Sequence, residues 1–252
     1  MQMFSTKKLS QLLTYPFKAE DANKKILIGS LFVLAGFIIP IIPFFFVLGY
    51  ATKISKRITS GDGKLTLPEW KDWDILFKDG ARLFGIYLVY SLPAIIVFGV
   101  GFILYFGSII PVTINESSGL AVVSILFGMS ALFLSIGVGL LLSLVESIFL
   151  PSAIMHAIQK ESFAAGFQIK QWWTIFRNNL AGFVVAFIFM FGLTYLLYFA
   201  VVISIYTFIL AIISPFLSAF LGFYLVLIIF PLMAQAYYEG NDHLETKQED
   251  LS

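Results

Sequence analysis

Three long stretches of the sequence carry no charged side chain, and they limit the possible folds more than any other feature. They cover Leu83 to Asn115, Ser117 to Val145 and Asn178 to Tyr238. Each exceeds the roughly 20 apolar residues that an α-helix needs to cross the hydrocarbon core of a bilayer. Because unpaired backbone groups are costly in lipid, such stretches cross membranes as helices. The sequence therefore predicts an all-α, polytopic helical membrane bundle.

The composition agrees with a membrane protein. Of the 252 residues, 59% are hydrophobic and only 12% are charged, against roughly 25% charged residues in ordinary soluble domains. The net charge of +1 indicates no nucleic acid partner. The absence of cysteine excludes disulfides and thiolate metal sites. The two histidines, His156 and His243, are too few for a His-rich cluster, so we expect no metal and no cofactor.

The segment from Leu67 to Gly80 differs from the apolar stretches because it is amphipathic. Thr66 and Glu69 have the spacing of a capping box, and Pro68 suits a first helical turn. Tryptophan prefers the boundary between membrane and water. We therefore predict an interfacial helix over about residues 67–80 that ends at Gly80, with an ordinary soluble loop helix as the alternative. Its aromatic face comprises Trp70, Trp73 and Phe77.

Two further segments have the same character. The first covers about residues 5–17, and the second covers about residues 165–178. In the second segment, Trp172 and Phe176 lie on one helical face, while lysine, arginine and asparagine lie on the other. The sequence thus predicts three interfacial amphipathic helices.

A single membrane domain is expected over residues 1–238. The remaining residues, 239–252, form a polar, acidic tail with a composition typical of disorder. The membrane domain contains predicted membrane segments at about residues 24–39, 43–58, 82–110, 118–150, 180–204 and 210–237.

The first apolar run, from Ile26 to Ala51, allows two topologies because Pro40 and Pro43 interrupt it. As one kinked span it gives five membrane segments, with the N-terminus outside. As a hairpin it gives six, with both termini cytoplasmic in the cell membrane. The hairpin places all 16 Lys and Arg on one side. We therefore favour the hairpin, because Lys and Arg accumulate in cytoplasmic loops, and the single span stays open.

A short motif occurs twice. Trp73-x3-Phe77-Lys78-Asp79-Gly80 is similar to Trp172-x3-Phe176-Arg177-Asn178-Asn179, and each copy precedes two apolar spans. The pattern predicts a pseudo-repeat in which an interfacial helix introduces a membrane hairpin. Chance similarity between apolar segments is the alternative.

A cluster of residues between 56 and 80 has a more specific pattern. It resembles a prokaryotic family of polytopic membrane proteins of unknown function, domain-of-unknown-function family 4013, and the resemblance covers most of residues 10–238. It implies a helical membrane protein and supplies no activity, substrate or catalytic residue. The residues that carry it are Lys56-Arg57, Gly61, Leu67-Pro68-Glu69-Trp70, Trp73 and Phe77-x-Asp79-Gly80, supported by Tyr15-Pro16-Phe17 and Phe163-Ala164-Ala165-Gly166-Phe167.

Two titratable residues are candidates for function. Glu146 lies in an apolar helix, where a charge is costly and usually faces a bundle interior or a wet cavity. It could relay protons or cations, or it could be a carboxyl near the interface or a neutral one bonded to a neighbouring serine. His156 follows Pro151 at the polar end of the same helix. It could act with Glu146, or it could be an interfacial histidine with local hydrogen bonds.

Asp79, beside Lys78 and Arg82, is expected to tie the end of the 67–80 helix to the bundle. A catalytic carboxylate pair or a divalent-ion site with the nearby aspartates is the weaker alternative. The candidate structural-interface residues are Trp70, Trp73, Phe77, Asp79, Gly80, Trp172 and Phe176.

The sequence contains no zinc-peptidase helix, phosphate-binding glycine loop or nucleophile motif, so we do not predict an enzyme. Two function classes stay open. The first is a non-enzymatic module that packs with the lipid bilayer, with other membrane proteins or with a second copy. The second is a small transporter or channel that uses Glu146 as an intramembrane carboxylate. We favour the first because the spans contain few polar groups.

Overall fold

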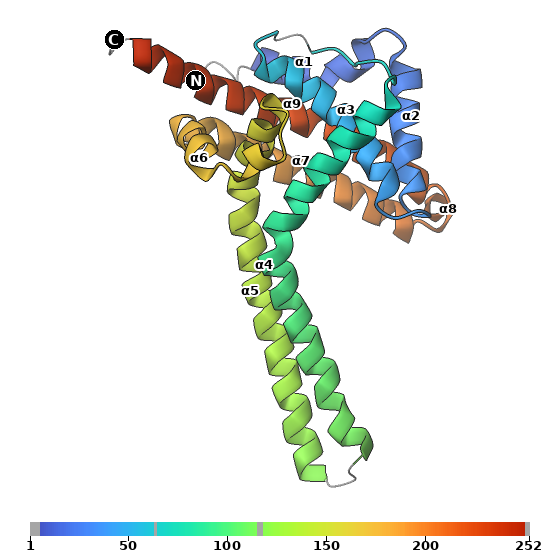
Figure 1. Cartoon of the computed structure of the whole chain (residues 1–252). Coiled ribbons are helices and arrows are strands. Elements are labelled where there is room, and N and C mark those ends of the chain that lie inside the picture. Colours follow the sequence, from blue (N-terminus) through green and yellow to red (C-terminus); the bar gives the residue numbers. More distant parts are fainter. Residues whose placement is uncertain (1–5, 63–64, 115–117, 250–252) are drawn as a thin grey trace. The chain divides into compact units, whose positions relative to one another are not determined.

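The computed structural model describes residues 6–62, 65–114 and 118–249, and within these ranges it contains helices and connecting segments only (Figure 1). The all-α prediction is therefore confirmed. The elements are α1 (Thr6–Lys18), α2 (Ala22–Ala35), α3 (Ile42–Thr59), α4 (Trp73–Ile114), α5 (Ser118–Gln159), the 3₁₀ helix η1 (Ala164–Phe167), α6 (Ile169–Asn178), α7 (Leu180–Tyr206), α8 (Phe208–Ala211) and α9 (Ser214–Glu249).

In the part of the chain that the structure describes, four helices are long and apolar enough to cross a membrane, which makes the chain a multi-pass membrane protein. These candidate spans are Trp73–Ile110, Gly119–Gln159, Leu180–Tyr206 and Ser214–Leu244. The chain divides into two compact units. Unit 1 comprises residues 1–86 and 151–252, and unit 2 comprises residues 87–150. The prediction of one membrane domain over residues 1–238 stays a prediction, and each unit is described by itself.

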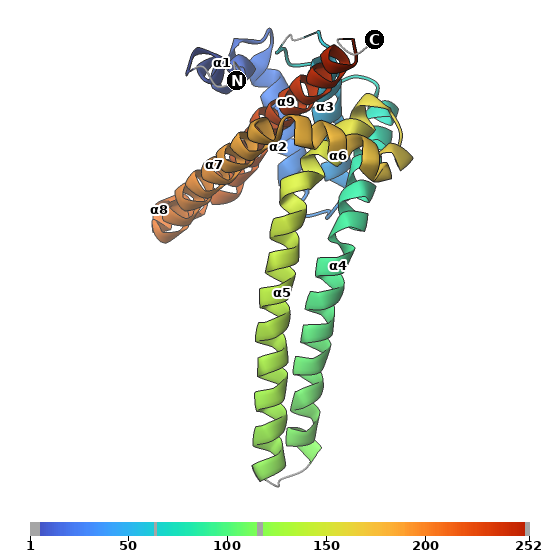
Figure 2. The same ribbon diagram turned by 90° about the vertical axis from the view of Figure 1, so that its left-hand side faces the viewer.

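Helix α9 is the centre of unit 1. It packs against α1, α2, α3, α6 and α7, and α7 and α9 lie side by side in both views (Figures 1 and 2). Phe223 and Leu227 of α9 are fully buried. Two hydrogen bonds hold α1 against α9: the Tyr15 hydroxyl donates to the carbonyl of Leu227 at 2.7 Å, and the Tyr224 hydroxyl donates to that of Leu13 at 2.9 Å.

The first apolar run forms two helices, α2 and α3, which pack against each other. The chain turns between them at Ile41, whose φ of 76° and ψ of −59° are those of a γ-turn. The amide of Ile42 donates to the carbonyl of Pro40 at 3.0 Å, which closes that turn. This run therefore folds as two short helices joined by a turn, whereas the predicted six-segment topology stays a prediction.

Unit 2 is a hairpin of the long helices α4 and α5, which run side by side (Figures 1 and 2). Small residues allow the two helices to approach closely. Gly101 lies against Ser135, and Gly128 lies against Ser108. The Ser124 hydroxyl also donates to the carbonyl of Ser108 at 2.8 Å.

Three boundary predictions are wrong. The helix predicted over about residues 67–80 instead starts at Trp73 and continues beyond Gly80 as α4. The predicted interfacial segment 165–178 is divided into η1 and α6. The tail is helical as far as Glu249, because α9 continues beyond Tyr238 and packs there against α6. At Gly240 a Cβ atom would lie only 2.6 Å from the Ile175 carbonyl oxygen. Residues 250–252 lie outside the described part of the chain.

Candidate functional site

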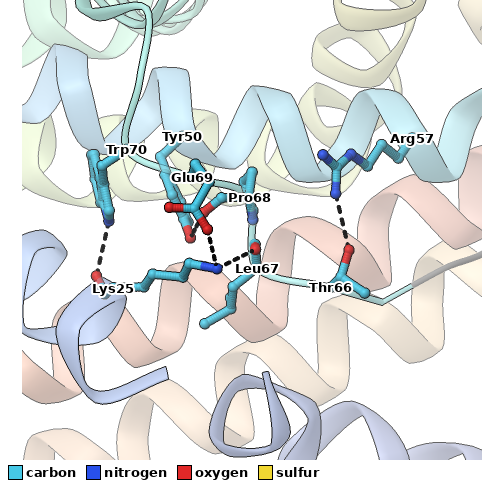
Figure 3. Close-up of polar contacts among 8 residues, drawn as sticks. All are labelled: Lys25, Tyr50, Arg57, Thr66, Leu67, Pro68, Glu69 and Trp70. Carbon is cyan, nitrogen blue, oxygen red and sulfur yellow. Dashed lines mark hydrogen bonds and ion pairs between the residues drawn. The ribbon is translucent and has the colours of Figure 1, made fainter. Parts of the chain in front are cut away.

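The segment Leu67–Trp70, called the strap below, is not helical and contacts both α2 and α3 (Figure 3). The hydroxyl of Tyr50 in α3 donates to the carbonyl of Pro68 at 2.8 Å, and the ammonium of Lys25 in α2 donates to that of Leu67 at 3.3 Å. These contacts satisfy carbonyl groups that a helix would have used internally. The strap thus fastens the α3–α4 connection to both helices of the hairpin.

Trp70 anchors the strap. Only 8% of its surface is exposed, and its indole N–H donates to the carbonyl of Lys25 at 2.9 Å. Its ring stacks on Tyr50 with centroids 4.1 Å apart and planes inclined by 17°. It also contacts the rings of Phe32 in α2 and Phe223 in α9. Trp70 is therefore a packing residue of unit 1 and not part of a helix face at the membrane surface.

The predicted capping box is not formed because both of its members have partners elsewhere. The Thr66 hydroxyl accepts a hydrogen bond from the guanidinium of Arg57 at 2.9 Å. The carboxylate of Glu69 pairs with the ammonium of Lys25 at 2.6 Å. The hydrogen bond and charge of that ammonium hold the pKa of Glu69 below its usual range. Because the Lys25 side chain is buried, its charge needs the compensation that Glu69 and the Leu67 carbonyl provide.

Gly80 lies inside α4, at the point where α4 crosses α3. A Cβ atom there would overlap the backbone carbonyl of Phe45, and a Cβ at Gly49 would overlap that of Leu76. Glycine is needed at both positions because the two backbones are in direct contact. The prediction that Gly80 ends a helix is wrong for this reason.

The other candidates near Gly80 have separate roles. Asp79 pairs with Arg82 in the next turn of α4 at 3.2 Å, and this ion pair is local to that helix. Trp73 and Phe77 are 44% and 39% exposed. Their rings contact Phe46 of α3, and Trp73 also contacts Trp70. These two side chains form the outer edge of an aromatic cluster centred on Trp70.

A recess with basic walls lies beside the strap. It has a volume of about 580 Å³ and is lined by Lys53, Lys56, Arg57 and Lys71 together with Asp62, Glu69 and Asp72. Lys53 donates to the Lys71 carbonyl at 2.8 Å and pairs with Asp72 at 3.1 Å. Lys56 pairs with Glu161, which lowers the pKa of that carboxyl. The recess is thus a partly neutralised basic surface next to the start of α4.

His156 lies in a second polar cluster of unit 1, formed by α5, α6 and α9. The ring is 2% exposed. Its Nδ1 lies 2.6 Å from the hydroxyl of Tyr237, and its Nε2 lies 3.0 Å from Oε1 of Gln171 and 3.3 Å from Oε1 of Gln168. The Tyr237 hydroxyl also donates to Oε1 of Gln159 at 3.0 Å. Each ring nitrogen therefore has a hydrogen-bond partner inside the protein.

These partners define two states of the His156 ring. Since Tyr237 donates its proton to Gln159, Nδ1 of the ring must carry a proton to donate to the tyrosine oxygen. Nε2 then either donates to the Gln171 oxygen or accepts from a Gln171 amide that has turned over. The cluster borders a recess of about 360 Å³ that is also lined by Lys160 and Lys170.

Trp172 and Phe176 are both 3% exposed. The hydroxyl of Ser152 in α5 donates to the Trp172 carbonyl at 3.0 Å, and the ring of Phe176 contacts that of Phe183 in α7. Their predicted equivalents, Trp73 and Phe77, are much more exposed. The two copies of the motif therefore occupy different environments, and the internal repeat stays a prediction.

Glu146 belongs to unit 2, where it is half-buried between α4 and α5. Its Oε1 accepts a hydrogen bond from the Ser91 hydroxyl at 2.8 Å. A serine partner of this kind is one of the alternatives that the sequence left open for Glu146. Since His156 lies in unit 1, the structure describes the two titratable candidates in separate environments.

The sequence could not identify several of the residues that hold these clusters together. Lys25, Tyr50 and Tyr237 have no motif that distinguishes them from other residues at helix ends or in apolar helices. Their partners are between 18 and 81 positions away in the chain. Within the described residues, no group of three or more His, Cys, Asp and Glu could hold a metal ion.

A comparison with known protein families gives a match over most of the chain. The model of a family described as "Protein of unknown function (DUF4013)" matches residues 32–206. This range includes the strap, Gly80, Glu146 and His156. No curated protein and no solved structure matches the chain.

Proposed function

The chain belongs to the DUF4013 family of proteins of unknown function, and from that premise we propose that it is a non-enzymatic membrane module that binds another membrane protein. The observation that supports this proposal is the uncovered apolar surface of the α4–α5 hairpin. Only 17% of the most apolar part of α4 and 11% of that of α5 are buried, against 17% for α7 and 44% for α9. A hairpin of this kind can be covered by lipid, by a partner protein or by a second copy.

Small residues on the hairpin favour a protein partner. Some of its glycines serve packing between α4 and α5, as at Gly101 and Gly128. Gly99, Gly107 and Gly137 have no atom within 4 Å of the position of a Cβ. In lipid, helix association depends on small residues that let backbones approach, because the hydrophobic effect does not favour helix contact over lipid contact. The open glycines therefore provide sites where a partner helix can pack closely.

The test is gentle purification of the full chain from its native membrane, followed by mass spectrometry of co-purifying proteins. We expect a stoichiometric partner. The double variant Gly107→Leu and Gly137→Leu should lose that partner, while the chain itself still elutes as a single monodisperse peak. Gly192→Leu is the matched control, because Gly192 of α7 is also open but lies outside the hairpin. Purification of a lone chain, or equal loss of the partner in the control, would contradict the proposal.

A transporter or channel that uses Glu146 is the second candidate. The half-buried carboxylate and its hydrogen bond to Ser91 favour it. Glu146→Gln keeps the size of the side chain and an acceptor for Ser91, so folding should be intact. If expression of this variant fully restores the wild-type phenotype in a deletion strain, Glu146 has no transport role.

We also propose a location in the cell membrane with both termini in the cytoplasm. The supporting pattern is that the connections 111–118 and 207–213 between candidate spans contain no Lys or Arg. A single cysteine at Ser5 would be unique in the chain. Labelling of that cysteine from outside intact cells by an impermeant reagent would contradict this orientation.

A further inference from the structure

The turn between α2 and α3 presents large apolar side chains on the surface of unit 1. Ile38 is 83% exposed and Phe37 is 66% exposed, and Ile39, Ile41 and Ile42 are each about half exposed. The γ-turn at Ile41 places these residues together at the end of the hairpin. Several neighbouring exposed isoleucines and a phenylalanine form a patch that needs an apolar environment.

The exposed apolar surface continues along one side of α2. Leu27 and Leu31 are 60% and 52% exposed and lie one helical turn apart. The opposite side of α2 packs on α9, where the ring of Phe223 lies directly against Gly29. One face of the hairpin is therefore covered by α9. The other face and the tip are apolar, and no described residue of unit 1 covers them.

The hairpin is too short to cross a bilayer. The apolar part of α2, from Ile26 to Ala35, rises about 15 Å, and the matching part of α3, from Ile42 to Ala51, rises about 15 Å. The hydrocarbon core of a bilayer is about 30 Å thick. Neither helix is among the four that are long and apolar enough to cross. The apolar part of each helix is therefore about half as long as the hydrocarbon core is thick, which is about the depth of one leaflet.

Charged residues mark the opposite end of the hairpin. Lys24 is exposed at the start of α2, and Lys56 and Arg57 are exposed near the end of α3. The recess of about 580 Å³ beside the strap has four basic residues, Lys53, Lys56, Arg57 and Lys71, against three acidic ones, Asp62, Glu69 and Asp72. Phosphate groups of lipids lie at the level where apolar side chains give way to basic ones, and each nearby Lys or Arg favours an anionic membrane surface.

We propose that the α2–α3 hairpin is a re-entrant element that enters a single leaflet and does not cross the membrane. Its occupant is lipid: acyl chains of that leaflet surround the tip at Ile38, and headgroup phosphates lie beside the exposed Lys24 and Arg57. The chain then has four spans. All 16 Lys and Arg still lie on one side of the membrane, because the hairpin returns to the side from which it enters. This proposal depends on the membrane location and not on the partner protein proposed above.

The depth of the tip can be measured with single cysteines, since the chain has no native cysteine. The full-length variants Ile38→Cys and Ser60→Cys are labelled with bimane and reconstituted into phosphatidylcholine vesicles that carry bromine at shallow or deep acyl positions. An impermeant maleimide is applied separately from each side. Phe37→Cys is a second tip position in case Ile38→Cys alters the turn.

We expect that the thiol of the Ser60→Cys variant reacts with the impermeant maleimide from one side only. The tip cysteine should react from neither side, and its bimane should lose fluorescence most strongly with the deep bromines. Reaction of the tip from the side opposite to that of the Ser60→Cys thiol would overturn the proposal, because the hairpin would then cross. Reaction from the same side would place the tip outside the bilayer, which contradicts the proposal as well. Protection without quenching by bromine would show a protein cover in place of lipid, which also overturns the proposal.

Discussion

Gly80 of α4 lies directly against the backbone carbonyl of Phe45 in α3, with no space for a Cβ atom between the two helices. One turn earlier in α4, the carbonyl of Leu76 has the same relationship to Gly49 of α3. The contact is thus reciprocal: a glycine of each helix lies against a backbone carbonyl of the other helix. The close approach fixes the position of α4 where it leaves the strap.

Gly80→Ala should destabilise the protein by about 3 kcal/mol or more, because the added methyl group must force the two helices apart. Gly99→Ala is the matched control on the same helix, since nothing lies within 4 Å of its Cβ position. It should change stability by less than about 1 kcal/mol. The measurement is thermal unfolding of the purified protein in one detergent. Equal stability of the two variants would show that α3 and α4 do not cross at Gly80.

Trp70→Phe should cost about 2 kcal/mol, because it removes the buried indole N–H that donates to the Lys25 carbonyl while it keeps an aromatic ring against Tyr50. Trp73→Phe is the control, since the Trp73 side chain is nearly half exposed, and it should cost less than about 1 kcal/mol. Chemical unfolding followed by circular dichroism measures both. A larger loss for Trp73→Phe would contradict the anchoring role of Trp70.

Ile41→Gly should raise stability by about 1 kcal/mol. A β-branched residue in a γ-turn with positive φ is strained by about 1–3 kcal/mol, and glycine adopts that conformation without strain at an entropic cost of about 0.5–1 kcal/mol. Ile41→Ala keeps the strain and should give no gain. Thermal unfolding of both variants in the same lipid separates the two effects. If both variants behave alike, strain at position 41 does not limit stability.

Glu69 should contribute to the acid sensitivity of the fold. Its pKa in the folded protein lies below the ordinary value of 4.5, chiefly because of the hydrogen bond from Lys25. A depressed folded pKa gives stability that is present above pH 4.5 and is lost as the pH falls through the folded pKa. Glu69→Gln should therefore weaken the loss of stability below pH 4.5.

Glu161→Gln provides the comparison for this pH experiment, because Lys56 lowers the pKa of Glu161 in the same way. The double variant should have a flatter acid limb than either single variant, as measured by unfolding midpoints between pH 3 and pH 6. Glu69→Gln with an unchanged acid limb would show that the pair with Lys25 has no energetic role. Both carboxylates are largely exposed, so the effect of each should be small.

The helical membrane fold could be predicted from the sequence because its strongest signal is local. Uncharged stretches longer than a bilayer allow only helices, and each of the four candidate spans contains most of one such stretch or lies largely within it. The break in the first apolar run was also predictable, since Pro40 and Pro43 interrupt helix formation there.

The strap and Gly80 were not predictable, because tertiary contacts override the local pattern at both places. The sequence from Thr66 to Glu69 has a good capping box, but Arg57 and Lys25 bind its two side chains and Tyr50 binds the Pro68 carbonyl. At Gly80 the local pattern favours a helix end, whereas the missing Cβ serves a helix crossing. The partners of His156 come from other elements of the fold, and no spacing along the chain brings them together.

The central position of α9 has a consequence for biosynthesis. α9 follows all the other helices that the structure describes, yet Tyr15, Gly29 and Trp70 contact it. During translation these residues emerge long before Phe223 and Leu227. Until α9 is synthesised, the surfaces of the first hairpin and of the strap that later contact α9 must therefore be covered by lipid or by the insertion machinery. The core of unit 1 closes only after α9 has been synthesised.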